Sequence, residues 1–124
     1  MNTRAQKIPG PDHPIVIQPH QGHVVVKVAG RVLADTRDAR SLLEASYAEV
    51  LYIPRKDADM SLLERSQHST HCPYKGDCSY FGVPSGGERS RNAVWSYENP
   101  FAAVIEIQNH LAFYRDRVDS IIVD

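Results

Sequence analysis

Apolar and polar residues alternate along this chain in short runs, and such alternation is typical of β-strands with one buried face. The clearest run covers residues 23–29, where β-branched residues dominate, and Ala29-Gly30 predicts a turn into a second strand over residues 31–34. Further strands are expected over residues 15–17, 50–53, 66–72, 77–83, 92–98, 111–114 and 120–123. This many short strands favours a curved antiparallel sheet, a barrel or a sandwich over an α/β fold.

Helical structure is expected in only a few places. Residues 36–45 predict a short helix, with Thr36 or Asp38 as its N-cap and with Leu42 and Leu43 facing inward. Residues 57–64 predict one or two helical turns and residues 101–105 predict one, whereas residues 84–91 predict a mobile loop because they are rich in glycine and serine. Prolines in residues 1–12 predict an extended arm, which leaves residues 13–124 as a single domain.

Length and charge limit the classes of protein to which this chain can belong. With 124 residues and 42% hydrophobic residues the chain can bury one core. Its formal net charge of −1 argues against a general nucleic-acid binder, which needs excess positive charge. No apolar run is long enough to span a membrane, and the first seven residues hold no apolar segment typical of a secretory signal. A cytoplasmic location is therefore expected, whereas the oligomeric state is left open, a dimer included.

Three segments carry a resemblance to a known family. They are residues 52–57 (YIPRKD), residues 72–76 (CPYKG) followed by Ser79-Tyr80, and residues 93–97 (AVWSY) followed by Pro100. In this order they resemble the bacterial domain of unknown function family 427, which sometimes carries a nucleotidyltransferase-like label. The resemblance implies a mainly β fold of the β-tent type, in which two antiparallel sheets enclose a cleft and two or three short helices complete the domain. It implies no established activity.

Cys72 is the candidate for catalysis. A lysine three residues later, Lys75, would stabilise the thiolate, which is the nucleophilic form of cysteine, and His71 would assist. The opposing interpretation is that Cys72 is a small buried residue. Lys75 also suits an anionic ligand group because it lies on a tight turn. Cys72 and Cys78 would lie near each other across a hairpin, where free thiols are expected in a reducing compartment.

Metal and nucleotidyl-transfer chemistry are disfavoured. His68, His71 and Cys72 cluster in the sequence, but His71 would point to the opposite face of a strand from the other two. Nucleotidyl transfer needs paired carboxylates that hold a divalent metal ion. Asp57 and Asp59 are the candidate pair, but no glycine-serine helix start precedes them. We therefore expect no metal site and no cofactor.

The remaining candidate is a group of aromatic residues with polar tips. Strand alternation places Trp95 and Tyr97 on one face, with Tyr52 expected nearby. Such rings are often core residues, but several polar tips beside cations suit a polar ligand better than a dry core. We therefore expect a small-molecule site that binds a polar or anionic molecule, lined by Tyr52, Arg55, Cys72, Lys75, Trp95 and Tyr97. The alternatives are a thiol-dependent or redox enzyme that uses Cys72, and a protein-interaction module without a ligand pocket.

Overall fold

The alternating sequence folds into an antiparallel β structure. A computed structural model describes residues 6–124, and the expected arm over residues 1–12 lies partly outside this range. Within it the strands are β1 (Ile15–Pro19), β2 (Val24–Val28), β3 (Arg31–Thr36), β4 (Arg40–Glu44), β5 (Val50–Tyr52), β6 (Glu64–Cys72), β7 (Gly76–Gly82), β8 (Val94–Ser96), β9 (Ala112–Phe113) and β10 (Ser120–Val123). The predicted mainly β class is confirmed.

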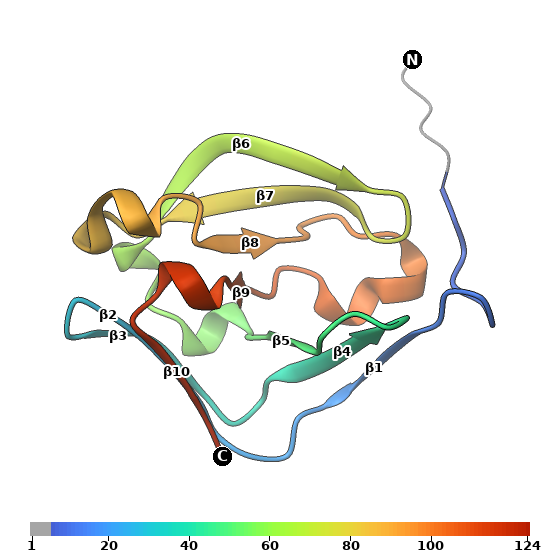
Figure 1. Ribbon diagram of the computed structural model, residues 1–124, viewed down its shortest axis with the longest axis horizontal. Helices are drawn as coiled ribbons and strands as arrows, with labels where there is room; N and C mark the ends of the chain where they lie inside the picture. Colours follow the sequence, from blue (N-terminus) through green and yellow to red (C-terminus); the bar gives the residue numbers. More distant parts are fainter. Residues whose placement is uncertain (1–5) are drawn as a thin grey trace.

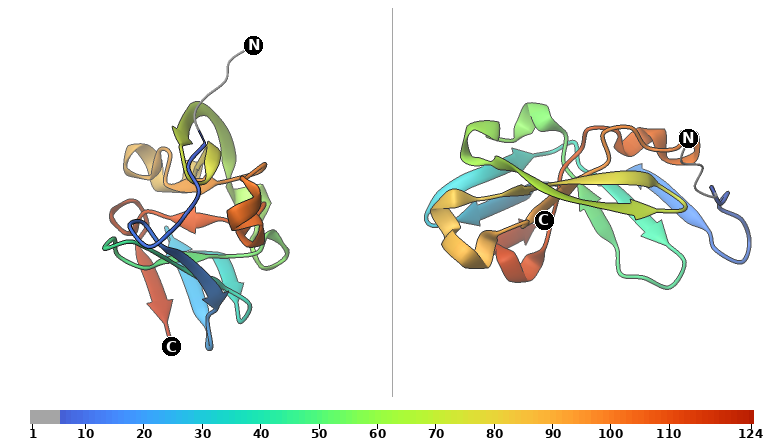
Figure 2. Two further views of the ribbon diagram at one scale, coloured as in Figure 1. Left: turned by 90° about the vertical axis from the view of Figure 1, so that its right-hand side faces the viewer. Right: turned by 90° about the horizontal axis from the view of Figure 1, so that it is seen from above.

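The strands form three antiparallel sheets, with the orders β6-β7-β8-β9, β1-β4-β5 and β10-β2-β3. In Figure 1 the four-stranded sheet lies above the two three-stranded sheets, and the left view of Figure 2 shows the same arrangement from the side. A reciprocal pair of backbone hydrogen bonds between Ile53 and Leu111, each 2.8 Å long, joins the layers next to β5 and β9. The domain is therefore one packed unit with a bent lower layer.

The lower layer is one long antiparallel ribbon that bends in the middle. β1 pairs with β4 and β2 pairs with β3, and the connections between β1 and β2 and between β3 and β4 lie side by side. At the bend the His20 amide donates to the Ala39 carbonyl oxygen at 2.8 Å. Beyond this contact the pairing shifts by one residue, which separates the ribbon into two sheets.

The predicted helix over residues 36–45 is wrong, because β4 occupies its second half. Strand pairing to β1 and β5 on both sides satisfies the backbone of β4, and this tertiary gain outweighs the local helix preference. The supposed cap is a local turn in which the Asp38 amide donates to Thr36 Oγ1 at 2.9 Å. As a consequence Leu42 is buried while Leu43 faces outward.

Short 3₁₀ helices fill most of the remaining connections: η1 (Arg55–Asp57), η2 (Met60–Leu62), η3 (Pro84–Ser90), η4 (Ala102–Ile107) and η5 (Arg115–Arg117). The predicted mobile loop over residues 84–91 is η3, which is ordered by its own contacts. Arg89 donates to the carbonyl oxygen of Val118 at 2.6 Å and to Asp119 at 2.8 Å. Its composition suggested mobility, but these long-range bonds fix it.

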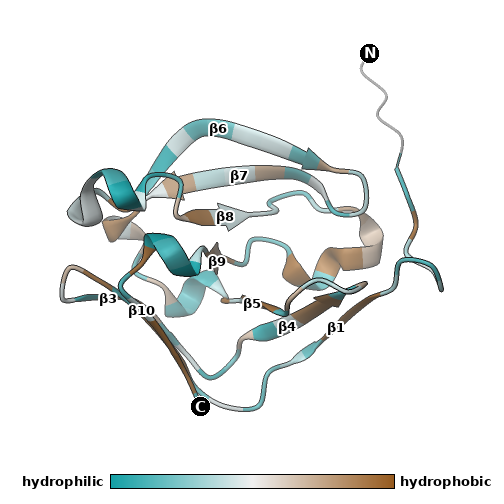
Figure 3. Cartoon of the chain, in the orientation of Figure 1, coloured by the Kyte–Doolittle hydropathy of each residue, from teal (hydrophilic) through white to brown (hydrophobic). Residues whose placement is uncertain are grey.

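The core has two parts, one for each half of the lower layer. One part lies against β2 and β3 and includes Val24, Val26 and Leu33. The other part lies against β4 and β5 and includes Tyr52, Tyr80 and Ile107. Figure 3 shows that β10 and much of β4 are hydrophobic, whereas β6 is mostly hydrophilic. β6 is accordingly an exposed edge strand. The second part of the core contains side chains with polar or reactive groups, namely Tyr52, Cys78, Tyr80 and Tyr97.

Candidate functional site

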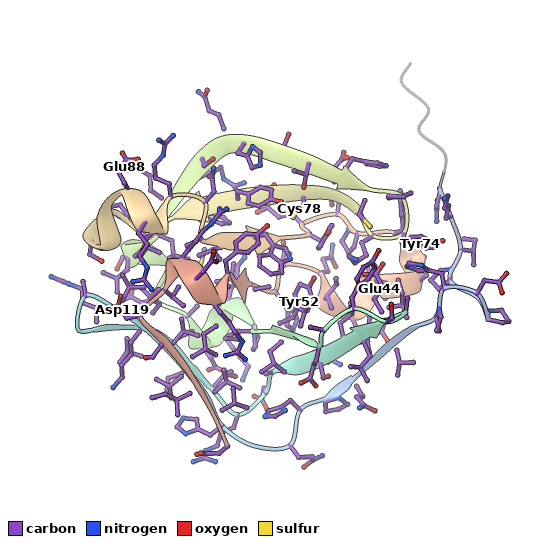
Figure 4. The ribbon with its side chains drawn as sticks, in the orientation of Figure 1. Glu44, Tyr52, Tyr74, Cys78, Glu88 and Asp119 are labelled. Atoms are coloured by element: carbon purple, nitrogen blue, oxygen red, sulfur yellow. The ribbon has the colours of Figure 1, made fainter. Side chains whose placement is uncertain are left out.

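A cavity of about 520 Å³ opens beside the second part of the core, and we call it the aromatic pocket. It lies between the four-stranded sheet and β4 and β5; Figure 4 labels Glu44, Tyr52 and Cys78 in this part of the molecule. Its lining combines tyrosine and tryptophan rings, a few aliphatic side chains and one ion pair: Leu42, Glu44, Tyr47, Ala48, Val50, Tyr52, Lys75, Tyr80, Trp95, Tyr97 and Tyr114.

Strand pairing brings two of these rings together. Tyr80 of β7 is directly opposite Trp95 of β8, so both side chains project from the same face of the sheet. Tyr97 follows Trp95 by two residues and lines the same cavity, as the alternation predicts. Four of the six predicted site residues, namely Tyr52, Lys75, Trp95 and Tyr97, therefore share one pocket.

The rings of Trp95 and Tyr114 form a partly exposed wall. Their centroids are 4.5 Å apart, with a tilt of 47° between the planes. The Trp95 indole nitrogen donates a hydrogen bond of 3.2 Å to the Tyr52 hydroxyl, and the two rings meet edge to face. Tyr52 itself is only 1% exposed. One side of the pocket is therefore rigidly held aromatic surface that solvent still reaches.

A buried ion pair forms the polar side of the pocket. Lys75 and Glu44 are 8% and 9% exposed, and the Lys75 ammonium donates to Glu44 Oε1. The His13 Nε2 lies 2.7 Å from the other carboxylate oxygen. Burial opposes ionisation of Glu44, but hydrogen bonds from Lys75 and then His13 outweigh it and lower the pKa of this carboxyl. Lys75 is thus already neutralised by the protein, although its ammonium also lies 5.9 Å from the centre of the Tyr97 ring.

The hydroxyls of Tyr52, Tyr80 and Tyr97 stay protonated at neutral pH. Burial raises the pKa of Tyr80 to about 12. Burial raises the pKa of Tyr97 and Tyr52 further, and the neighbouring cysteines add to the effect. Tyrosines in this state serve as hydrogen-bond donors and acceptors and not as general bases. The arrangement is suited to holding a polar molecule.

The two cysteines lie along the same face of the β6–β7 hairpin, and neither forms a disulfide. Cys72 is opposite Gly76 and Cys78 is opposite Thr70, so the thiols are diagonal neighbours. Cys78 is 2% exposed, and burial raises the pKa of its thiol. Cys72 is half-buried and packs against the second part of the core, and it does not line the aromatic pocket.

The partners that the sequence suggested for Cys72 are engaged elsewhere. Lys75 donates to Glu44. His71 bonds Asp77 at 2.7 Å, and strand alternation directs it away from the face that carries Cys72. The sequence pattern predicted an activated thiolate, but the structure gives Cys72 neither of these two groups as an activator.

Arg55 lies outside the aromatic pocket, so the expectation that it shares a cleft with Lys75 is wrong. Its guanidinium donates to Ser96 Oγ at 3.0 Å and to Glu98 Oε2 at 2.9 Å. Ser96 alternates with Trp95 along β8, so Arg55 lies on the opposite face of the sheet from the rings.

On that opposite face Glu98 collects several donors, and we call this group the Glu98 cluster: Arg55, Arg65, Ser79, Ser96 and Glu98. Arg65 donates twice to the carboxylate, at 3.0 and 2.7 Å, and Ser79 donates once at 3.0 Å. The hydrogen bond from Arg65 is the main reason that the pKa of Glu98 falls to about 2, although partial burial opposes the fall. The Glu98 carboxylate is thus satisfied by donors of the protein itself, whereas the Nε of Arg55 is buried without a hydrogen-bond partner.

Sequence reasoning missed Glu44 and His13. Glu44 alternates with Leu42 along β4, so both point inward, but the helix predicted for this segment concealed that pattern. His13 stacks on Tyr74 with ring centroids 3.9 Å apart, and it bonds the Glu44 carboxylate but does not itself line the pocket. A strand assignment for residues 40–44 would have shown the buried carboxylate.

Neither a metal-binding group nor a membrane-spanning helix is found among residues 6–124. No group of three or more His, Cys, Asp or Glu side chains in that range is arranged to hold a metal ion. In the same range no helix has both the length and the apolar character that crossing a bilayer demands.

Comparison with known proteins assigns the chain to a family. A search among curated proteins found no match. The family model described as "Domain of unknown function (DUF427)", whose name carries a nucleotidyltransferase-like label, matches residues 16–124 and so covers the ordered motifs, all the strands except the first residue of β1, and the whole lining of the aromatic pocket. The chain therefore belongs to the DUF427 family of domains of unknown function.

Proposed function

We propose that this domain binds a small polar molecule with a flat face in the aromatic pocket. The observation that carries the proposal is the Trp95–Tyr114 wall, which borders a cavity of about 520 Å³ and keeps both rings partly exposed. Rings that served only as core would be sealed by neighbouring side chains. Ligand pockets commonly combine such rings with a few polar groups that fix the orientation of the ligand.

The charges of the pocket favour a neutral polar ligand over an anionic one. The Lys75 ammonium is compensated by Glu44, and Arg55 is committed to Glu98 on the other face of the sheet. An added anion would therefore meet no uncompensated cation among these groups. A carbonyl or amide can still accept hydrogen bonds from Lys75 and from the protonated hydroxyl of Tyr97, while Trp95 and Tyr114 stack on its flat part.

Trp95 is the only tryptophan, so its fluorescence reports on this pocket directly. We expect acrylamide to quench Trp95, and we expect a subset of flat neutral compounds, chosen from nucleobases, nucleosides and cyclic amides, to change its emission and protect it from quenching. Tyr97→Phe removes a single hydroxyl and should weaken the response by about tenfold, because one hydrogen bond to the ligand is lost.

Tyr74→Phe is the matched control, because Tyr74 does not line the aromatic pocket. It should leave the response unchanged. The proposal is wrong if acrylamide does not reach Trp95, or if Tyr74→Phe and Tyr97→Phe weaken the response equally. A thiol-dependent activity at Cys72 is not proposed as a second function, because the expected activators Lys75 and His71 bond to other residues.

A further inference from the structure

A second hollow lies where the long β-ribbon of the lower layer bends. We call it the bend groove; its volume is about 600 Å³. It is bordered by the connection from β1 to β2 on one side and by the connection from β3 to β4 on the other, and the His20–Ala39 hydrogen bond ties the two connections together. The groove lies at the Arg40 end of β4, whereas Glu44, at the other end, lines the aromatic pocket. The two sites are therefore separate.

Positive charge dominates the bend groove. Arg37, Arg40 and Lys56 line it, and Asp38 is the one carboxylate among its lining residues. Asp38 is already engaged by the Lys56 ammonium at 2.5 Å. Within residues 6–124, neither Arg37 nor Arg40 has a carboxylate within ion-pair distance. Two guanidinium groups are thus left uncompensated at one hollow, in contrast to Lys75 and Arg55.

Two imidazoles add hydrogen-bonding capacity to the same groove. The Nε2 of His20 is buried without a hydrogen-bond partner, and it lies beside Gly22, which also lines the groove and which the main-chain oxygen of Asp124 approaches as well. His110 uses its Nδ1 to bond the Gln108 carbonyl at 2.9 Å, which leaves Nε2 as its free end. A buried nitrogen without a partner is costly, and a bound oxygen would remove that cost.

We propose that the bend groove binds a phosphate group, with Arg37 and Arg40 as its charged donors and His20 and His110 as additional partners. The planar donor fork of arginine matches phosphate oxygens, and hydrogen bonds between charged groups are about twice as strong as neutral ones. The volume of the groove exceeds that of a bare phosphate ion, so an organic phosphate ester also fits. This proposal does not depend on the function proposed for the aromatic pocket.

His110 provides a readout that a nonspecific charge effect would not give. Burial, and then the nearby charge of Arg40, lower the pKa of His110. A bound phosphate would offset both causes, so the titration of His110 observed by NMR should move to higher pH when phosphate is added. In the free protein, Arg40→Gln should also raise the pKa of His110, because one repulsive charge is gone.

The test titrates the whole chain with inorganic phosphate, with ribose 5-phosphate and with acetate at constant ionic strength. We expect both phosphates to shift the His20 and His110 signals saturably, whereas acetate does not. Arg37→Gln should weaken phosphate binding by about tenfold or more, since a charge-assisted hydrogen bond is lost. Because Arg37 is exposed, this variant should fold even if Arg40→Gln does not.

Arg31→Gln is the matched control, because Arg31 is an exposed arginine of β3 that does not line the groove. Tighter binding of ribose 5-phosphate than of inorganic phosphate would assign the groove to phosphate esters, and equal binding would assign it to the phosphate group alone; both support the proposal. The proposal is overturned if acetate shifts the histidine signals as much as phosphate does, or if Arg31→Gln and Arg37→Gln weaken binding equally.

Discussion

The two faces of the β7–β8 strand pair use polar groups in opposite ways. On one face, Tyr80 and Trp95 border a cavity, and Trp95 keeps part of its surface exposed. On the other face, Ser79 and Ser96 belong to the Glu98 cluster, in which the acceptors of Glu98 are filled by side chains of the protein. The first face has ring surface and hydrogen-bonding groups available for a ligand. On the second face the polar groups bond one another and hold the strands together.

The difference between the two faces explains why residue type alone placed Arg55 in the ligand site. Arg55 and Lys75 both looked like ligand-binding charges, but each is neutralised by a glutamate within its own layer of side chains. The aromatic wall remains available beside Lys75, whereas Arg55 lies outside the aromatic pocket. A charge indicates a ligand site only when the protein has not already compensated it.

The largest effect is expected from breaking the Glu98 cluster. Glu98→Gln should lower the free energy of unfolding at pH 7 by about 2–3 kcal/mol, because Arg55 and Arg65 lose their charged acceptor. Urea denaturation measures this loss. Glu88→Gln removes a fully exposed carboxylate that pairs with Arg91 at 3.3 Å, and should cost less than about 1 kcal/mol. Equal costs for the two variants would contradict the assigned role of the cluster.

The Glu98 cluster should also make the free energy of unfolding depend on pH in the acid range. The pKa of Glu98 is about 2 in the folded state and returns to its ordinary value near 4.5 on unfolding. The stabilisation is therefore complete above about pH 5 and is lost as the pH falls toward 2. The difference in unfolding free energy between the natural protein and Glu98→Gln should shrink over that interval. A difference that stays constant from pH 7 to 2.5 would rule out this linkage.

A smaller effect is expected on the aromatic face. Trp95→Phe removes the donor to the Tyr52 hydroxyl, and should cost about 1 kcal/mol because a single neutral hydrogen bond is lost. A double-mutant cycle with Tyr52→Phe isolates the interaction, and we expect a coupling free energy of about 0.5–1.5 kcal/mol. A coupling near zero would mean that this bond does not organise the wall.

The smallest perturbation compares the two thiols by single cysteine-to-serine substitutions. In single-cysteine variants, Cys78→Ser leaves Cys72 to be labelled, and Cys72→Ser leaves Cys78. Iodoacetamide should label the half-buried Cys72 at least about tenfold faster, because Cys78 is buried, its pKa is raised, and it reacts only after local opening. Equal labelling rates would show that the hairpin opens more readily than its packing implies.

Local patterns were sufficient for most strands and insufficient for one. The run over residues 23–29 and the turn at Ala29-Gly30 predicted β2 and β3, and residues 120–123 matched β10. β4 was missed because its sequence favours a helix, while its pairing partners, β1 and β5, lie elsewhere in the chain. Distant backbone partners cannot be read from a window of ten residues, and their hydrogen bonds decided the outcome.

By itself the sequence determined the mainly β class and placed Trp95 and Tyr97 on one face of a strand, because side-chain alternation is a property of the local backbone. Tertiary structure decided which distant groups joined them. It brought Tyr52, Glu44 and Lys75 to the rings by packing β4, β5 and the β6–β7 turn together, and it sent Arg55 to the other side of the sheet. Such pairings depend on how sheets stack, which no single segment encodes.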